Sequence, residues 1–183
     1  MPRETLGCLL SLDLPADFIY GNGEAAVLAQ LAGRTPAAVP ERHRPAILWN
    51  ADQVREEYGD RVAGWPLTLR LETPGTGSVL FCHATPRNDN EIFTSLTPEE
   101  RLRPIFDGLD ASLVVCGHTH MPFDRMVGRT RVVNAGSVGM PFGDPGADWL
   151  LLESSGPEDF AARFILQPPT AAEMLDVFTR ASI

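Results

Sequence analysis

The sequence of 183 residues contains no long apolar run, and its start lacks the features of an export signal. No stretch approaches the ~20 consecutive apolar residues that a membrane-spanning helix needs. The first 16 residues make a poor signal peptide, because Glu4 and Asp13 interrupt the segment that would have to be apolar. We therefore expect a soluble cytoplasmic protein that does not associate with a membrane.

Cysteine and positive charge are also scarce. The cysteines Cys8, Cys82 and Cys116 are widely spaced and odd in number, which excludes a disulfide framework and a paired-cysteine zinc site. Lys and Arg number 15 against 24 Asp and Glu, so the formal net charge is −9, and no basic run occurs. Such a field repels a phosphate-rich polymer, so no nucleic acid polymer is expected as a partner. A small phosphorylated substrate remains compatible, because a bound divalent metal ion reverses the charge locally.

What remains is an average globular composition, with 44% hydrophobic and 21% charged residues. We expect a single domain over residues 1–183. Helical and alternating patterns predict an α/β fold in which two β-sheets are flanked by helices. Helices are expected at 2–12, 24–31, 45–57, 98–109 (with Thr97 as its N-cap) and 170–180. Strands are expected at 18–20, 67–72, 78–82, 113–116, 123–127, 131–133, 149–153 and 160–166, with turns at 59–66 and 74–77.

Three of the four histidines follow predicted strands, either directly or in the turn at the strand end. His83 comes directly after the predicted strand 78–82, and His118 and His120 lie in the turn after the predicted strand 113–116. The carboxyl ends of strands open into the crevice where α/β sheets bind ligands, and imidazole is the commonest neutral ligand of transition metals. Asn22 lies in a Gly-Asn-Gly turn after the predicted strand 18–20, and its amide oxygen suits manganese, magnesium or a mixed nitrogen and oxygen site.

Each signal alone has an ordinary structural interpretation. A single strand-end histidine such as His83 is more often hydrogen-bonded than a ligand, and Gly-Asn-Gly is most often a turn. His43 lies in a charged helix approach and is expected to be solvated, while Cys82 and Cys116 are expected to be buried strand thiols. The occurrence of all three polar signals at predicted strand ends favours a metal site.

These motifs resemble the calcineurin-like metallophosphoesterase superfamily, and most closely its small bacterial and archaeal phosphodiesterase branch. The order and spacing agree from about residue 1 to residue 153. The matching pieces are Gly21-Asn22, His83-Ala84-Thr85-Pro86, Gly117-His118-Thr119-His120 and Val133-Asn134-Ala135-Gly136-Ser137-Val138-Gly139.

The resemblance implies a four-layer αββα sandwich with a dinuclear site for manganese, iron or zinc. It assigns Asn22, His83 and His118 to one ion, as catalytic residues, and His120 to the other. It also implies a phosphodiesterase or phosphatase that hydrolyses a small phosphate ester through a metal-bound hydroxide. Arg87 and Asn90, in the loop after His83, are candidate substrate contacts, with a solvated loop as the alternative.

Two departures from the family pattern concern the amino-terminal side of the site. The family begins with a strand ending in Asp-x-His and a second strand ending in Gly-Asp, and residues 1–12 contain neither. We therefore expect that the first strand–helix–strand unit is absent from this chain, with one or no metal bound and weak or no activity. Gly23 also stands where many relatives carry a histidine that assists the leaving group.

Two other functions stay open at this point. The chain could be a non-catalytic protein-binding scaffold of the same fold, as one subunit of eukaryotic retromer is, or a binding module with a residual one-metal site. Unpaired sheet edges left by a missing unit would favour a homo-oligomer.

Overall fold

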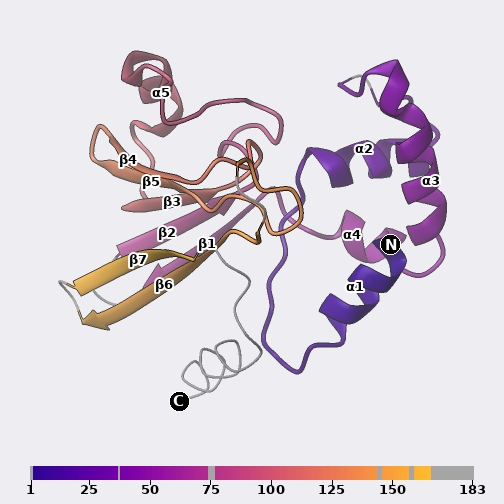
Figure 1. Ribbon diagram of the computed structural model, residues 1–183, viewed down its shortest axis with the longest axis horizontal. Coiled ribbons are helices and arrows are strands. Elements are labelled where there is room, and N and C mark those ends of the chain that lie inside the picture. Colours follow the sequence, from indigo (N-terminus) through magenta and orange to yellow (C-terminus); the bar gives the residue numbers. More distant parts are fainter. Residues whose placement is uncertain (1, 37, 74–76, 144–145, 157–158, 166–183) are drawn as a thin grey trace. The chain divides into compact units, whose positions relative to one another are not determined.

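The structure is a computed structural model that describes residues 2–36, 38–73, 77–143, 146–156 and 159–165 (Figure 1). At residue 73 and from residue 154 onward, only the backbone is described. The predicted helix at 170–180 and most of the predicted turn at 74–77 lie outside the described residues. The chain divides into two compact units, Met1–Leu67 and Thr68–Ile183, and each is described by itself.

The first unit is helical. Its helices are α1 (Pro2–Leu10), α2 (Asn22–Leu31), α3 (Arg44–Val54) and α4 (Gly59–Ala63), with a short 3₁₀ turn at Glu41–His43. The first turn of α2 is fixed by Glu24, whose Oε2 accepts the backbone N–H of the N-cap residue Gly21 at 2.8 Å. Phe18 stacks on Trp65 with the ring centroids 5.0 Å apart, which holds the segment before α2 against the end of the unit.

Four sequence predictions in this unit are wrong. Residues 18–20 form no strand: the Tyr20 N–H bonds only to the carbonyl of Pro66 among described backbone groups, and the segment pairs with no described strand. Asn22 is the first residue of α2 rather than part of a tight turn, because Glu24 caps the helix there. The predicted turn at 59–66 contains α4, and the predicted helix at 45–57 ends earlier, at Val54.

The second unit is built on a five-stranded sheet in the order β1-β2-β3-β5-β4. Its strands are β1 (Thr68–Thr73), β2 (Gly77–Cys82), β3 (Leu113–Cys116), β4 (Phe123–Val127) and β5 (Thr130–Asn134). The central strands β2, β3 and β5 run parallel, while β1 and β4 pair antiparallel at the two edges. All four residues of β3 are buried, as expected for a central strand covered on both faces.

A second sheet covers one face of the first. It consists of β6 (Trp149–Gly156) and β7 (Asp159–Ile165), paired antiparallel. Leu150 and Leu152 of β6 pack against the buried side chains Val79, Leu113, Val115 and Val133 of the five-stranded sheet. The predicted α/β class with two sheets is therefore confirmed.

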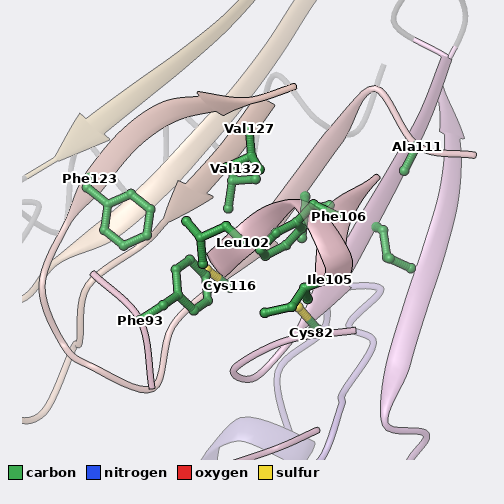
Figure 2. Close-up of a cluster of buried hydrophobic side chains, with 12 residues drawn as sticks. Cys82, Phe93, Leu102, Ile105, Phe106, Ala111, Cys116, Phe123, Val127 and Val132 are labelled. Atoms are coloured by element: carbon green, nitrogen blue, oxygen red, sulfur yellow. The ribbon is translucent and has the colours of Figure 1, made fainter. Parts of the chain in front are cut away.

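The other face of the five-stranded sheet is covered by α5 (Glu99–Phe106), as Figure 2 shows. Phe93 lies between Phe106 and Phe123, in edge-to-face contact with each at centroid distances of 5.5 and 5.6 Å. The helix begins after Pro98, so Thr97 is not its N-cap. The Thr97 hydroxyl instead accepts the N–H of Thr94 at 2.9 Å, and the helix has no side-chain cap at its N-terminus.

Cys82 and Cys116 end β2 and β3 inside this core, where they are 3% exposed. Burial raises the pKa of the Cys82 thiol to about 12 and that of Cys116 well above its ordinary value, so both stay protonated. Cys8, on α1, is exposed. No helix in the described part of the chain is long and apolar enough to cross a membrane.

A thiol count tests this packing. In the native protein, a disulfide reagent at pH 8 should label only Cys8 within minutes, because only a thiolate reacts and the other two thiols are protonated and inaccessible. After unfolding in guanidinium chloride all three should react. Cys8→Ser should abolish the native signal, and rapid labelling of Cys82 or Cys116 in that variant would contradict the described core.

Candidate functional site

The carboxyl ends of the three parallel strands place polar side chains along one edge of the five-stranded sheet. His83 directly follows β2, residues 117–120 follow β3, and Asn134 is the last residue of β5, paired in register with Cys116. The backbone N–H of Gly117 donates to the carbonyl of His83 at 2.8 Å, which joins the turn after β3 to the end of β2. The sheet itself thus brings the two histidine loops together.

The side chains of His83 and His118 lie close together at this edge. The Nε2 atom of His83 lies 3.1 Å from Nδ1 of His118, and the rings meet edge to face with their centroids 5.0 Å apart. Both side chains are partly buried. Two ring nitrogens 3.1 Å apart can either share a proton in a hydrogen bond or bind the same metal ion.

The turn that carries His118 and His120 has an unusual backbone. Both residues adopt positive φ angles, 67° and 59°, a left-handed conformation that costs energy for a residue with a Cβ. The Thr119 N–H closes the turn on the carbonyl of Gly117 at 2.8 Å, and the Phe142 N–H donates to the carbonyl of His120 at 3.0 Å. The surrounding chain therefore holds both histidines in place.

Asn134 is the main support of this turn. It is fully buried, and its Nδ2 group donates to the Gly117 carbonyl at 2.5 Å and to the Thr119 hydroxyl at 3.1 Å. Its Oδ1 atom accepts the Gly136 N–H at 2.9 Å. One amide thus connects the end of β5, the turn after β3 and the loop that follows β5.

The surroundings of His118 favour its neutral form. Burial lowers the pKa of His118 and the nearby His120 lowers it further, against a hydrogen bond to the backbone carbonyl of Asn90 and the charge of Asp89, which raise it. Neutral imidazole is the form that binds a metal ion. A second hydrogen bond from the ring to a carbonyl is also typical of metal-binding histidines.

Comparisons with known proteins identify the family of this chain. The model of the calcineurin-like phosphoesterase superfamily domain matches residues 8–156. The chain belongs to this superfamily. No curated protein matches the chain at a significant level.

Two solved structures have a similar fold to this phosphoesterase-family chain. The hypothetical protein PH1004 from Pyrococcus horikoshii OT3 has a TM-score of 0.75 and 17% identity, over 99% of this chain and 75% of its own. The metallophosphoesterase from Sphaerobacter thermophilus has a TM-score of 0.64 and 21% identity, over 100% of this chain and 78% of its own. At sequence identities of 17% and 21%, the structural similarity establishes the fold alone.

The imidazole pair of this superfamily member fits a divalent metal ion in part. Two nitrogens bound to one ion at about 2.0–2.1 Å stand about 2.9–3.3 Å apart at octahedral or tetrahedral angles, a range that contains the separation of His83 and His118. In the part of the chain that the structure describes, no group of three or more His, Cys, Asp or Glu side chains is placed to hold an ion. The donor chemistry and spacing therefore suit a metal, and the pair alone supplies two ligands.

The remaining sequence candidates have different surroundings. His120 lies in the same turn, two residues after His118, whereas Asn22 is exposed at the start of α2 in the helical unit. Arg87 forms an ion pair of 2.5 Å with Glu91, and Glu91 also accepts the Thr85 hydroxyl at 2.9 Å. The Arg87 guanidinium is thus engaged within its own loop.

Asn90 contributes through its backbone. Its carbonyl accepts a hydrogen bond from His118, and its N–H donates to Oδ1 of Asn88 at 2.7 Å.

Asn134 is a functional residue that the sequence did not single out. It belongs to one of the motifs that resemble the family, but the sequence assigned it no role. The available signal was an amide directly after two apolar strand residues, Val132 and Val133, because a buried amide must find hydrogen-bond partners inside the protein.

Replacing Asn134 tests the support of the histidine turn. Asn134→Asp has nearly the same shape, yet it places a carboxylate oxygen against the Gly117 carbonyl and removes the donor to Thr119. We expect a loss of about 2–4 kcal/mol in the free energy of unfolding, measured with urea. Asn88→Asp, in an exposed loop position, is the matched control and should change stability by less than about 0.5 kcal/mol.

Gly136 offers a second test in the same loop. Its φ is +78°, and an added Cβ would clash with the Cβ of the buried Asp148. Gly136→Ala should therefore lower the free energy of unfolding by at least about 2 kcal/mol. Gly139→Ala, three residues on, has nothing within 4 Å of the added atom and serves as its control. Equal stability of the two variants would show that this loop packs differently.

Proposed function

We propose that this protein is a metal-dependent phosphoesterase that hydrolyses a small phosphate ester at the edge of the sheet where β2 and β3 end. Membership of the calcineurin-like phosphoesterase superfamily supports a hydrolase. The observation that carries the proposal is the 3.1 Å approach of His83 Nε2 to His118 Nδ1, from two parallel strands that end side by side.

The site residues act by holding metal ions in a fixed place. His83 and His118 would bind one ion, and His120 would bind a second ion. When bound, a pair of manganese, iron or zinc ions polarises the phosphoryl group and lowers the pKa of the attacking water. Asn134 keeps the two histidines of the turn in their left-handed conformations, and burial keeps His118 neutral.

The charge of the chain supports a small substrate. With a formal net charge of −9 and no basic run, the protein repels extended phosphate polymers, and the metal ions would supply the positive charge that a phosphate needs. Arg87 is already paired with Glu91, so substrate binding by Arg87 would require that pair to open. Gly23 has no side chain to protonate a leaving group, so we assign that role to water.

A metal-binding measurement separates this proposal from its alternatives. Calorimetry with Mn²⁺ and Zn²⁺ on the whole chain should show binding that His118→Ala weakens by about 100-fold or more, because one of two paired ligands is lost. Hydrolysis of bis(4-nitrophenyl) phosphate in excess Mn²⁺ should fall by at least the same factor. His43→Ala is the control, since His43 is exposed and bonded to Arg42 in the helical unit.

The possible failures have distinct meanings. Metal binding that depends on His118 but supports no turnover with Mn²⁺, Fe²⁺ or Zn²⁺ would indicate a metal-binding module. A folded protein that binds none of these ions at the histidines would contradict the proposal and favour a non-catalytic scaffold.

A further inference from the structure

Large apolar side chains stand exposed on the loop that closes one side of the histidine turn. Val138, Met140 and Phe142 are 69%, 70% and 67% exposed, which is unusual for three such residues in five positions. Gly139 and Gly143 have no atom within 4 Å of an added Cβ, so this part of the loop is open to solvent. No charged residue occurs between Arg131 and Asp144. We call Val138, Met140 and Phe142 the apolar rim.

The apolar rim is joined directly to the site. The backbone N–H of Phe142 donates to the carbonyl of His120 at 3.0 Å, and the Met140 N–H donates to the hydroxyl of Ser137 at 3.0 Å. The same loop begins at Asn134, which holds the turn of His118 and His120. A group bound at the histidines would therefore have the rim beside it.

A further exposed apolar side chain belongs to the loop that contacts His118 through Asn90. Ile92 is 72% exposed and lies two residues after Asn90, whose carbonyl accepts the hydrogen bond from His118. The histidine turn is thus contacted by two loops, and each of them carries apolar side chains into solvent. This arrangement offers a polar centre with apolar surroundings, as ligand sites for amphipathic molecules do.

We propose that the apolar rim binds the non-polar part of the substrate, so that the natural substrate is a phosphate ester carrying an alkyl or aryl group. This inference rests on the proposed phosphoesterase function. The occupant is a single small molecule rather than a protein, because three partly covered side chains offer well under the about 800 Å² per partner of a stable interface. A net charge of −9 also disfavours an anionic membrane surface.

A chain-length series tests the proposal directly. The probes are methyl, butyl and octyl 4-nitrophenyl phosphate, kept below micelle-forming concentrations with Mn²⁺ present. Hydrolysis adds the oxygen of water to phosphorus and breaks the bond to 4-nitrophenolate, which leaves with the electron pair while the proton is released to solvent. All three esters share this leaving group, so their kcat/KM values differ mainly through the alkyl chain.

The wild-type protein should hydrolyse the octyl ester at least about tenfold more efficiently than the methyl ester, because the longer chain removes more apolar surface from water. The triple variant Val138→Thr, Met140→Gln, Phe142→Gln should reduce this ratio to within about threefold. Its backbone hydrogen bond from residue 142 to His120 does not depend on the side chain. Met126→Gln, on β4 and 53% exposed, is the matched control and should keep the wild-type ratio.

A binding measurement separates failure of the rim from failure of the enzyme. Octylphosphonate and methylphosphonate have no ester bond, so their affinities can be compared by calorimetry even if no ester is hydrolysed. The octyl compound should bind at least about tenfold more tightly to the wild type and lose this advantage in the triple variant. If no ester is hydrolysed but this difference holds, the phosphoesterase function fails and the apolar site stands.

Three outcomes would overturn the proposal. The first is equal kcat/KM and equal affinity across the series in the wild type, and the second is an unchanged ratio in the triple variant. The third is that the rim binds something else. In that case kcat/KM and affinity would not change with alkyl chain length, and the protein would either sediment with phosphatidylcholine vesicles or form a dimer. Only the triple variant would abolish that vesicle binding or dimer.

Discussion

The amide of Asn134 is the interaction on which the rest of the site depends. Its Nδ2 group bonds to the Gly117 carbonyl and the Thr119 hydroxyl, while its Oδ1 atom holds the Gly136 N–H. Together with the backbone bond from Thr119 N–H to the Gly117 carbonyl, these bonds offset the cost of placing His118 and His120 at positive φ. Because Asn134 ends β5 in register with Cys116 of β3, the sheet determines where the amide lies.

The same loop combines two opposite requirements. Its first residue, Asn134, is buried and fully hydrogen-bonded, which makes the histidine turn rigid. A few residues later the loop exposes Val138, Met140 and Phe142, which no described part of the chain covers well. A rigid polar centre next to exposed apolar side chains suits a substrate that has both characters, since the polar part fixes position and the apolar part adds affinity.

Much of the sheet unit could be predicted from sequence because its signals are local. The strands 78–82 and 113–116 are short apolar runs followed by histidine, and parallel pairing then places His83 beside His118. The helical unit was less predictable, because its structure depends on contacts between distant residues. Phe18 belongs to an apolar run typical of a strand, yet it stacks on Trp65 instead.

Side-chain partners explain the other differences. Thr97 has the residue type of an N-cap, but its hydroxyl accepts the Thr94 N–H, and α5 begins after Pro98. Arg87 suits a phosphate contact by charge, but Glu91 is its neighbour four residues on. A sequence motif indicates which side chains can react, whereas their competing partners become visible only in the folded chain.

The central claim is that His83 and His118 share a metal ion, and nitrogen NMR of the histidine rings during zinc titration tests it most directly. The account predicts that the resonances of His83 Nε2 and His118 Nδ1 shift together and saturate at the same zinc concentration, while those of His43 stay unchanged. The claim would be contradicted if, at saturating zinc, the resonances of both histidines were still those of two rings that share a proton.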